Sequence, residues 1–104
     1  MREIDINQTA SALEGGGTLI DVRESEEYAE GHVPGTRSLP MSVLTSRLDE
    51  LDRTAPVHVI CASGNRSSAM VDVLTAQGFD AVNVRGGTKA WISSGRPVDT
   101  GATR

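Results

Sequence analysis

Short apolar runs alternate along the chain with segments in which apolar residues recur every three or four positions. The runs predict β-strands at residues 4–6, 18–22, 38–39, 57–60 and 79–84. The three-to-four spacing, with polar residues suited to helix starts, predicts helices at residues 7–13, 25–30, 42–51, 66–77 and 88–94. Strands that alternate with helices indicate an α/β domain, with a mainly parallel central sheet of about five strands and helices on both faces.

Individual residues are expected to set the ends and faces of these elements. Asn7 and Ser25 should cap the first two helices, and Gly78 should end the helix that begins at Arg66. That helix should bury one apolar face, made of Ala69, Met70, Val73 and Leu74. The helix predicted at residues 42–51 carries a stripe that we assign to the core, made of Met41, Leu44, Leu48 and Leu51.

The single cysteine of the chain stands where a predicted strand gives way to a predicted helix. Cys61 follows the β-rich run Val57–Ile60 directly and precedes the small residues Ala62, Ser63 and Gly64. In an open α/β sheet, ligands bind beyond the carboxyl ends of the strands. This loop is therefore the strongest candidate for a chemical site.

The expected surroundings of the cysteine favour an anion. A helix N-terminus presents unpaired backbone N–H groups and partial positive charge, and successive loop amides can converge on one atom. Such surroundings lower the pKa of a cysteine below the free value of about 8.5, and the thiolate is the reactive form. Gly64 can adopt a positive φ, which lets the backbone curl around the sulfur, and Arg66 adds a permanent positive charge.

A lone cysteine can instead be an inert, buried small hydrophobe. Here the position between an apolar strand and a helix start, with Gly64 and Arg66 in the same loop, favours reactivity. We interpret Cys61 as a nucleophile that backbone amides activate, without a dedicated base.

Four other polar residues could support the site, but their positions favour structural roles. His32, between glycine and valine in a predicted turn, is better explained as a hydrogen-bonded residue than as a general base. His58 lies three residues before Cys61 on one strand, so its side chain should point to the opposite face. Asp21 and Arg23 share a face at the end of another strand, and we treat both as supporting residues. Arg23 either adds positive charge near the site or forms a structural ion pair or hydrogen-bonded latch, and contact of Arg23 or His32 with the substrate stays open.

Length and charge limit the domain organisation, the binding partners and the location that this chain can have. A chain of 104 residues suits one domain, residues 1–97, followed by a polar tail, residues 98–104. A net charge of -4 argues against binding to nucleic acid or to an anionic membrane surface. No apolar run reaches transmembrane length, the first residues do not form a signal peptide, and one cysteine forms no internal disulfide; we therefore expect a cytoplasmic protein.

Four motifs follow one another along the chain: Leu19–Arg23, Glu27-Tyr28 with Gly31–Gly35, Cys61–Ser67, and Val84–Gly87 with Trp91. Together they resemble the single-domain rhodaneses, the thiosulfate-type sulfurtransferases, over roughly residues 3–97. The resemblance implies a single rhodanese-like domain that carries a persulfide on Cys61. It also implies that a substrate- or anion-binding loop surrounds the sulfur, made of Ala62, Ser63, Gly64, Asn65, Arg66 and Ser67.

The reaction implied by the resemblance has two steps. The Cys61 thiolate takes a sulfane sulfur from thiosulfate, with release of sulfite, or from a persulfide donor. An acceptor, which is cyanide or a cellular thiol on a small molecule or a protein, then removes that sulfur. Because the chain has no second cysteine, the acceptor must come from outside it. No cofactor or metal is implied, and the oligomeric state stays open.

Two other functions remain open. Cysteine-dependent phosphatases and arsenate reductases also use a Cys-to-Arg loop at a helix start, but loops of the tyrosine-phosphatase type are longer than the four residues between Cys61 and Arg66. The tighter loop suits one sulfur atom better than a phosphoryl group. The other alternative is a non-catalytic rhodanese-like binding module, although such family members often lack the cysteine that is present here.

The sequence says less about the sulfur donor. Mercaptopyruvate-type relatives have loops that end without arginine, so Arg66 favours thiosulfate or a persulfide donor. Efficient thiosulfate users tend to place extra cations at the pocket rim, whereas this chain has Glu26 and Glu27 nearby. Thiosulfate could therefore be only a laboratory donor, and the physiological donor, acceptor and pathway stay open.

Overall fold

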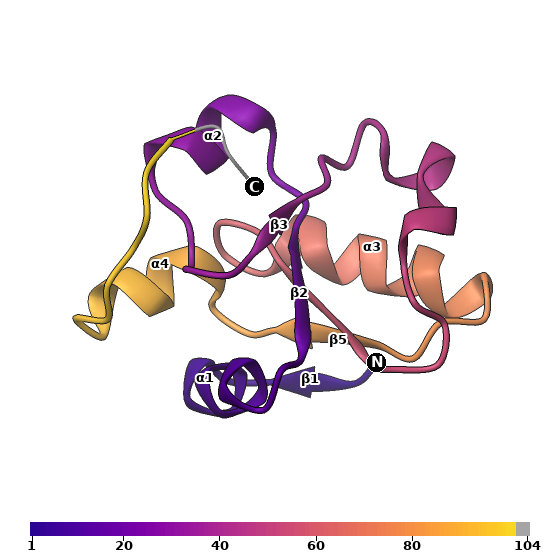
Figure 1. The fold of residues 1–104 in the computed structure, drawn as a ribbon, viewed down its shortest axis with the longest axis horizontal. Coiled ribbons are helices and arrows are strands. Elements are labelled where there is room, and N and C mark those ends of the chain that lie inside the picture. Colours follow the sequence, from indigo (N-terminus) through magenta and orange to yellow (C-terminus); the bar gives the residue numbers. More distant parts are fainter. Residues whose placement is uncertain (102–104) are drawn as a thin grey trace.

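A five-stranded sheet forms the centre of the molecule, and the computed structural model describes residues 1–101 of the chain (Figure 1). The strands are β1 (Glu3–Ile4), β2 (Thr18–Asp21), β3 (Arg37–Ser38), β4 (Val57–Ile60) and β5 (Ala81–Val84). They lie in the order β1-β5-β4-β2-β3, and every neighbouring pair is parallel. The prediction of a parallel α/β sheet is confirmed, and β4 is its central strand.

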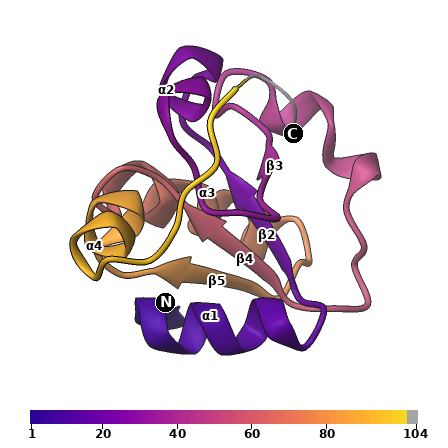
Figure 2. The same cartoon turned by 60° about the vertical axis from the view of Figure 1, so that its left-hand side comes forward.

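Helices cover both faces of this sheet (Figure 2). The α-helices are α1 (Ile6–Glu14), α2 (Ser25–Glu30), α3 (Asn65–Ala76) and α4 (Gly87–Ser93). Two short 3₁₀ turns, η1 (Leu44–Ser46) and η2 (Leu48–Glu50), lie between β3 and β4. Helix α3 packs against β4 and β5, whereas α1 packs against α4 and β2.

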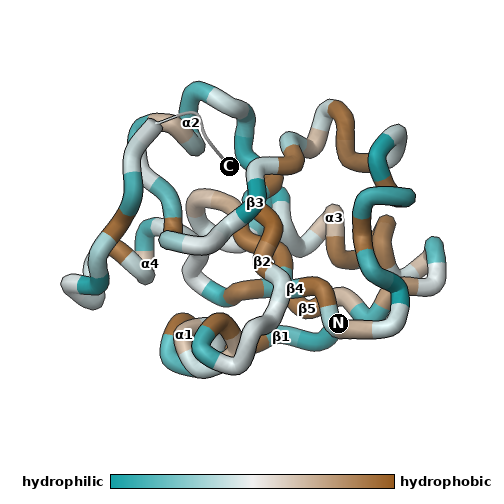
Figure 3. The backbone as a smooth tube through the Cα atoms, viewed as in Figure 1, coloured by the Kyte–Doolittle hydropathy of each residue, from teal (hydrophilic) through white to brown (hydrophobic). Residues whose placement is uncertain are grey.

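Alternating side chains of the central strands divide the core into two layers. One layer joins Ile20 and Val59 to Val71 and Leu74 of α3, and it also contains Cys61. The other layer joins Leu19, Ile60 and Val84 to Trp91 of α4 and to partly buried side chains of α1. Each fully buried aliphatic side chain contributes about 1.5–3 kcal/mol relative to its exposed state. Hydrophobic stretches accordingly follow the central strands, with hydrophilic segments at the periphery (Figure 3).

Two of the predicted helix caps are wrong by one or two residues. Asp5, not Asn7, caps α1, because its side chain accepts from Gln8 N (2.8 Å) while the Gln8 side chain accepts from Asp5 N (2.9 Å). This capping box ends β1 at Ile4, earlier than predicted. Glu24, not Ser25, holds the cap position of α2.

The predicted helix at residues 42–51 is wrong, since the chain forms the two separate turns η1 and η2 there. Arg47, between them, has φ -127° and ψ 23°, outside the helical region. The Ser46 hydroxyl also donates to Val43 O (2.8 Å), a local bond that competes with a regular helix. Leu44 and Leu51 still reach the core, but Met41, assigned to it, is 37% exposed.

The buried face of α3 is turned slightly from the predicted one. Its buried residues are Ser67, Met70, Val71 and Leu74, at the expected spacings of three and four. Ala69, assigned to this face, is exposed, and Val73 is only half-buried. The rotation places the hydroxyl of Ser67, in the first turn, on the side that faces the sheet.

The chain beyond residue 97 returns to the end of α2. His32 and Asp99 form an antiparallel bridge with two backbone hydrogen bonds of 2.9 Å, and Gly101 N donates to Ala29 O (2.9 Å). The domain boundary at residue 97 stays a prediction. The rest of the predicted tail, residues 102–104, lies outside the described residues.

Candidate active site

Cys61 lies at the carboxyl end of β4, beside the end of β2. The hydrogen bond from Val22 N to Ile60 O (3.0 Å) joins these two strand ends. Cys61 is only 1% exposed and belongs to the core layer under α3. The thiol is therefore sheltered from bulk water, at the edge of the sheet where α/β proteins bind ligands.

The N-terminus of α4 holds the first two peptide groups after β4. Thr88 N donates to Cys61 O (2.9 Å), and Lys89 N donates to Ala62 O (3.0 Å). In a planar trans peptide the N–H points opposite to the C=O, so a carbonyl held by α4 turns the next N–H the other way. The Ser63 N–H accordingly lies on the side of the sulfur, where it is one of the backbone donors that favour the thiolate.

Gly87 makes this close approach of α4 possible. Its φ is +60°, and a Cβ there would lie 2.4 Å from Cys61 O and 2.7 Å from Ala62 O. Any other residue would push α4 away from the loop. The Gly86-Gly87 pair thus serves the geometry of the cysteine loop, although it lies more than twenty residues further along the chain.

The sulfur of Cys61 accepts hydrogen bonds from the start of α3. Gly64 N lies 3.1 Å from Sγ, and the Ser67 hydroxyl oxygen lies 3.3 Å from it. Gly64, with φ +104°, holds the N-cap position that turns its N–H inward. Burial alone would raise the pKa of the Cys61 thiol, but bonds from the Ser67 hydroxyl and from the N–H groups of Ser67, Gly64 and Ser63 outweigh it. The pKa is therefore lowered below its ordinary value.

A chain of polar side chains leads from this sulfur to the surface. The Ser67 hydroxyl is 2.6 Å from Asn83 Oδ1, and Asn83 Nδ2 donates to Glu3 Oε2 (2.8 Å). Since a hydroxyl has one proton, Ser67 donates either to Asn83 or to Cys61 at a given moment. Sequence reasoning missed Asn83; the available signal was one amide in an otherwise apolar strand, β5.

Arg66 is engaged in an ion pair that the sequence did not indicate. Its guanidinium donates to Glu27 of α2 through two bonds, 2.7 Å to Oε1 and 2.9 Å to Oε2. The hydrogen bond from Arg66 lowers the pKa of Glu27 from 4.5 to about 2. The same bond, together with the charges of Glu27, Cys61 and Asp21, raises the pKa of Arg66. The positive charge expected beside the sulfur is present, but a carboxylate already balances it.

Asp21 and Arg23 form a second ion pair, which is sealed in the interior. Arg23 Nη2 lies 2.8 Å from Asp21 Oδ2 and also donates to Gly31 O (2.8 Å). Arg23 N and Nε both donate to Asp21 Oδ1 (3.0 Å each). The side chains are 8% and 0% exposed. This pair joins the end of β2 to the end of α2, as a structural latch does.

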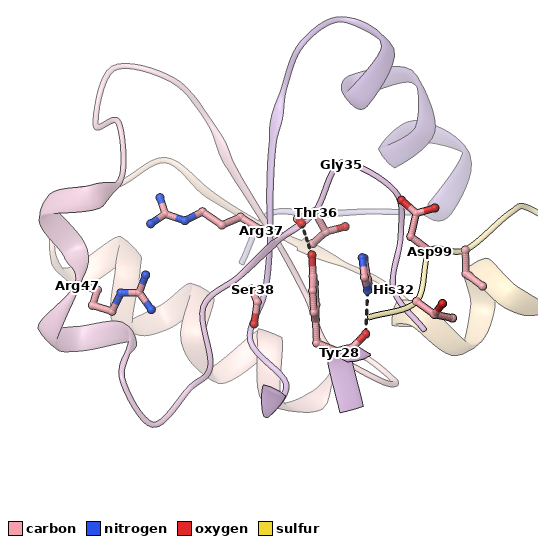
Figure 4. A pocket seen from close by; sticks show the side chains of 10 residues that line it. Tyr28, His32, Gly35, Thr36, Arg37, Ser38, Arg47 and Asp99 are labelled. Carbon is pink, nitrogen blue, oxygen red and sulfur yellow. Dashed lines mark hydrogen bonds between the residues drawn. The ribbon is translucent and has the colours of Figure 1, made fainter. Parts of the chain in front are cut away.

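The two histidines have structural contacts away from the sulfur. His58 Nδ1 lies 3.0 Å from Thr18 O of the neighbouring strand. His32 stacks on Tyr28 with ring centroids 3.7 Å apart, and its Nδ1 lies 2.8 Å from Tyr28 O. His32 lines a surface hollow between Arg37 and Asp99, whose lining includes no residue of the loop 61–67 (Figure 4).

The remaining loop residues place few side-chain groups near the sulfur. Ala62 is half-buried, and Ser63 and Asn65 are exposed, so the loop contributes mainly its backbone. Among residues 1–101, no group of three or more His, Cys, Asp or Glu side chains is arranged to hold a metal ion. Within the same residues, none of the helices combines the length and hydrophobicity that a membrane span needs. The arrangement can stabilise negative charge on one sulfur.

Comparisons with known proteins point to one family. The family model described as rhodanese-like domain matches residues 5–94. A Bacillus subtilis protein, YtwF, whose name provisionally calls it a sulfurtransferase, is 42% identical over 79 residues, which cover 76% of this chain and 77% of that protein. The thiosulfate sulfurtransferase GlpE of Actinobacillus pleuropneumoniae is 38% identical over 100 residues, which cover 94% of this chain and 93% of the relative.

A solved structure agrees with these sequence matches. The crystal structure of a rhodanese-related protein from Thermoplasma volcanium superposes with a TM-score of 0.88 at 35% sequence identity. The match covers 95% of this chain and 98% of that one.

Proposed function

The chain belongs to the rhodanese-like domain family, and from this premise we propose that it is a sulfurtransferase that carries the transferred sulfur as a persulfide on Cys61. The observation that carries the proposal is the contact of Gly64 N with Sγ at 3.1 Å, inside a loop whose amides lower the pKa of the thiol. The donors that stabilise a thiolate would also stabilise a terminal persulfide anion.

In the first step, the Cys61 thiolate attacks the outer sulfur of the donor. One S–S bond forms to Cys61 while the S–S bond of thiosulfate breaks, and its electron pair leaves with sulfite. A persulfide donor would react in the same way and would release its thiolate. No proton is transferred in either case, which suits a site where His32 and His58 both contact backbone oxygens elsewhere.

In the second step, an external nucleophile attacks the outer sulfur of the persulfide and the Cys61 thiolate is regenerated. Cyanide would leave as thiocyanate, and a cellular thiol would leave as a new persulfide. Because Cys61 is the single cysteine, the acceptor is a separate small molecule or protein. We place the reaction in the cytoplasm, where an unpaired thiol stays reduced.

Intact-mass spectrometry tests this proposal directly. Incubation with thiosulfate, or with a small alkyl persulfide, should add the mass of one sulfur atom, and cyanide should then remove it with formation of thiocyanate. The variant Cys61→Ser should fold and lose both events. Transfer that persists in Cys61→Ser would refute the mechanism.

The same protein preparation separates the two alternatives. Turnover of a phosphate ester without sulfur uptake would favour the phosphatase class, because both chemistries use a Cys-to-Arg loop. Failure of the folded wild-type protein to take up sulfur from either donor would favour a binding module.

A further inference from the structure

We propose that Glu27 sets the donor specificity of this site. Its carboxylate occupies both guanidinium nitrogens with which Arg66 would bind an anion. This contact disfavours dianionic donors such as thiosulfate relative to alkyl persulfides, which bring no second anionic group. This inference rests on the proposed sulfurtransferase function. It assigns a role to an acidic residue that belongs to α2, not to the cysteine loop.

The geometry of the pair is that of a bound anion. Both guanidinium nitrogens of Arg66 that face α2 are used, at 2.7 Å and 2.9 Å from the two oxygens of Glu27. A planar fork of this kind is what a sulfonate or phosphate group would otherwise bind. Arg66 immediately precedes Ser67, whose hydroxyl lies 3.3 Å from the Cys61 sulfur, and the charge of Arg66 interacts with that of Cys61. The Glu27 carboxylate therefore neutralises Arg66, which is the cation of the cysteine loop.

Glu27 is held in place by more than Arg66. Its Oε1 also accepts from the backbone N–H of Glu24 (3.2 Å), across the first turn of α2. Its pKa of about 2 keeps it charged at every pH near neutrality, so the carboxylate does not leave the fork by protonation. A donor that needs Arg66 must displace a fixed, charged competitor.

The competitor is nevertheless within reach of solutes. The side chains of Glu27 and Arg66 are each 38% exposed, whereas those of Asp21 and Arg23 are almost fully buried. Arg66 can therefore exchange Glu27 for another anion, whereas Arg23 cannot exchange Asp21.

Other charges near the fork do not replace Arg66. Arg23 is already bound to Asp21. Glu24 and Glu26 add negative charge to the first turn of α2. The exposed Lys89 adds positive charge where α4 meets the loop, and Arg85, just before α4, is paired with Glu3. Thiosulfate carries two negative charges and releases a dianion, so it needs a free cation. An alkyl persulfide carries one charge on the sulfur, which the loop amides can receive.

The first test compares donors in matched variants. Sulfur loading of Cys61 is followed by intact mass, with thiosulfate and with hydroxyethyl persulfide, in wild type, Glu27→Gln and Glu26→Gln. Glu26 lies in the same helical turn and loses the same charge, but it is exposed and does not contact Arg66 in the described structure. From the strength of one Coulomb contact near a surface, Glu27→Gln should raise the ratio of thiosulfate to persulfide rates by about tenfold, and Glu26→Gln by less than about twofold.

A double variant tests whether the gain passes through Arg66. In an Arg66→Gln background, Glu27→Gln should no longer raise the ratio, because the fork that it frees is gone. The inference would be overturned if the ratio of thiosulfate to persulfide rates changed equally in Glu26→Gln and Glu27→Gln, or changed in neither. It would also be overturned if Glu27→Gln still raised this ratio in the Arg66→Gln background.

A second readout does not depend on sulfur transfer. Iodoacetate and iodoacetamide alkylate the same thiolate, but only the first is an anion. Glu27→Gln should raise the rate with iodoacetate relative to iodoacetamide, and Glu26→Gln should leave this ratio nearly unchanged; equal ratios in all three proteins would overturn the inference. If the wild-type protein accepts sulfur from neither donor, the proposed function fails and the specificity inference fails with it. If it accepts sulfur from both donors and neither ratio responds to Glu27, only the inference fails.

Discussion

The two arginine–carboxylate pairs near the site have the same chemistry and opposite degrees of burial. Asp21 and Arg23 are sealed, with side chains 0% and 8% exposed, and Arg23 also donates to Gly31 O. Glu27 and Arg66 are each 38% exposed, and Arg66 belongs to the cysteine loop itself. Burial makes the first pair a fixed part of the fold, because neither charge can return to water. Exposure leaves Arg66 able to exchange Glu27 for another anion.

The largest expected effect comes from breaking the sealed pair. Arg23→Met leaves the Asp21 carboxylate buried without its partner, which should cost about 3–5 kcal/mol of the free energy of unfolding. Chemical denaturation of the variant measures this loss. A loss below about 1 kcal/mol would mean that Asp21 finds solvent or another donor, and that the pair is not the latch described here.

The next effect concerns the hydrogen bonds to the Cys61 sulfur. Ser67→Ala removes a donor to Cys61 and leaves the buried Asn83 oxygen without a partner, which should cost about 1–3 kcal/mol of stability. It should also raise the pKa of Cys61, seen as an alkylation-rate profile displaced to higher pH. Ser68→Ala, one residue along on the same helix, serves as the control and should leave the profile in place. Identical profiles in both variants would remove Ser67 from the set of activating donors.

Breaking the exposed pair should change the stability little and the pKa of the Cys61 thiol more. Arg66→Met should cost only about 0–1 kcal/mol of stability, because a half-exposed ion pair is screened by solvent. It should nevertheless raise the pKa of the Cys61 thiol, since a cation near the sulfur is lost and the charge of Glu27 is left unbalanced. Denaturation and thiol alkylation on one sample measure both quantities. A stability loss as large as that of Arg23→Met would erase the contrast between the two pairs.

The smallest effect is the dependence of the exposed pair on pH. The pKa of Glu27 is depressed in the folded state, from 4.5 to about 2. The contribution of the ionised Glu27 side chain to the free energy of unfolding is therefore fully present above pH 4.5, and it is lost as the pH falls toward about 2. The stability difference between wild type and Glu27→Gln, at most about 1 kcal/mol, should shrink over that interval. A difference that stays constant down to the acid limit would show that Glu27 does not act through its charge.

Local patterns predicted the parts of this site that are local in the sequence. The run Val57–Ile60 forms β4 as expected, and the helix that follows begins within one residue of its predicted start. Apolar spacing and glycine placement are strong over such short distances. The family resemblance, which rests on four separated motifs, is confirmed by the match over residues 5–94.

Contacts between segments that are distant in the sequence could not be predicted from local patterns. Glu27 and Arg66 are 39 positions apart, and Ser67 and Asn83 are 16 apart. Which carboxylate meets which cation depends on how α2 and α3 approach each other across the strand ends, and periodicity does not encode this. The helix predicted at residues 42–51 failed for a different, local reason: Arg47 leaves the helical region of φ and ψ, and the Ser46 hydroxyl bonds Val43 O.

Titration of the single thiol by ultraviolet absorbance tests the central claim most directly. The thiolate absorbs where the thiol does not, and Cys61 is the single cysteine, so an inflection that is absent from Cys61→Ser belongs to this thiol. If the loop amides and Ser67 hold negative charge on the sulfur, the inflection lies below the free cysteine value of about 8.5, and Cys61→Ser lacks it. An inflection at or above that value would contradict the account, because burial would then outweigh every donor around the sulfur.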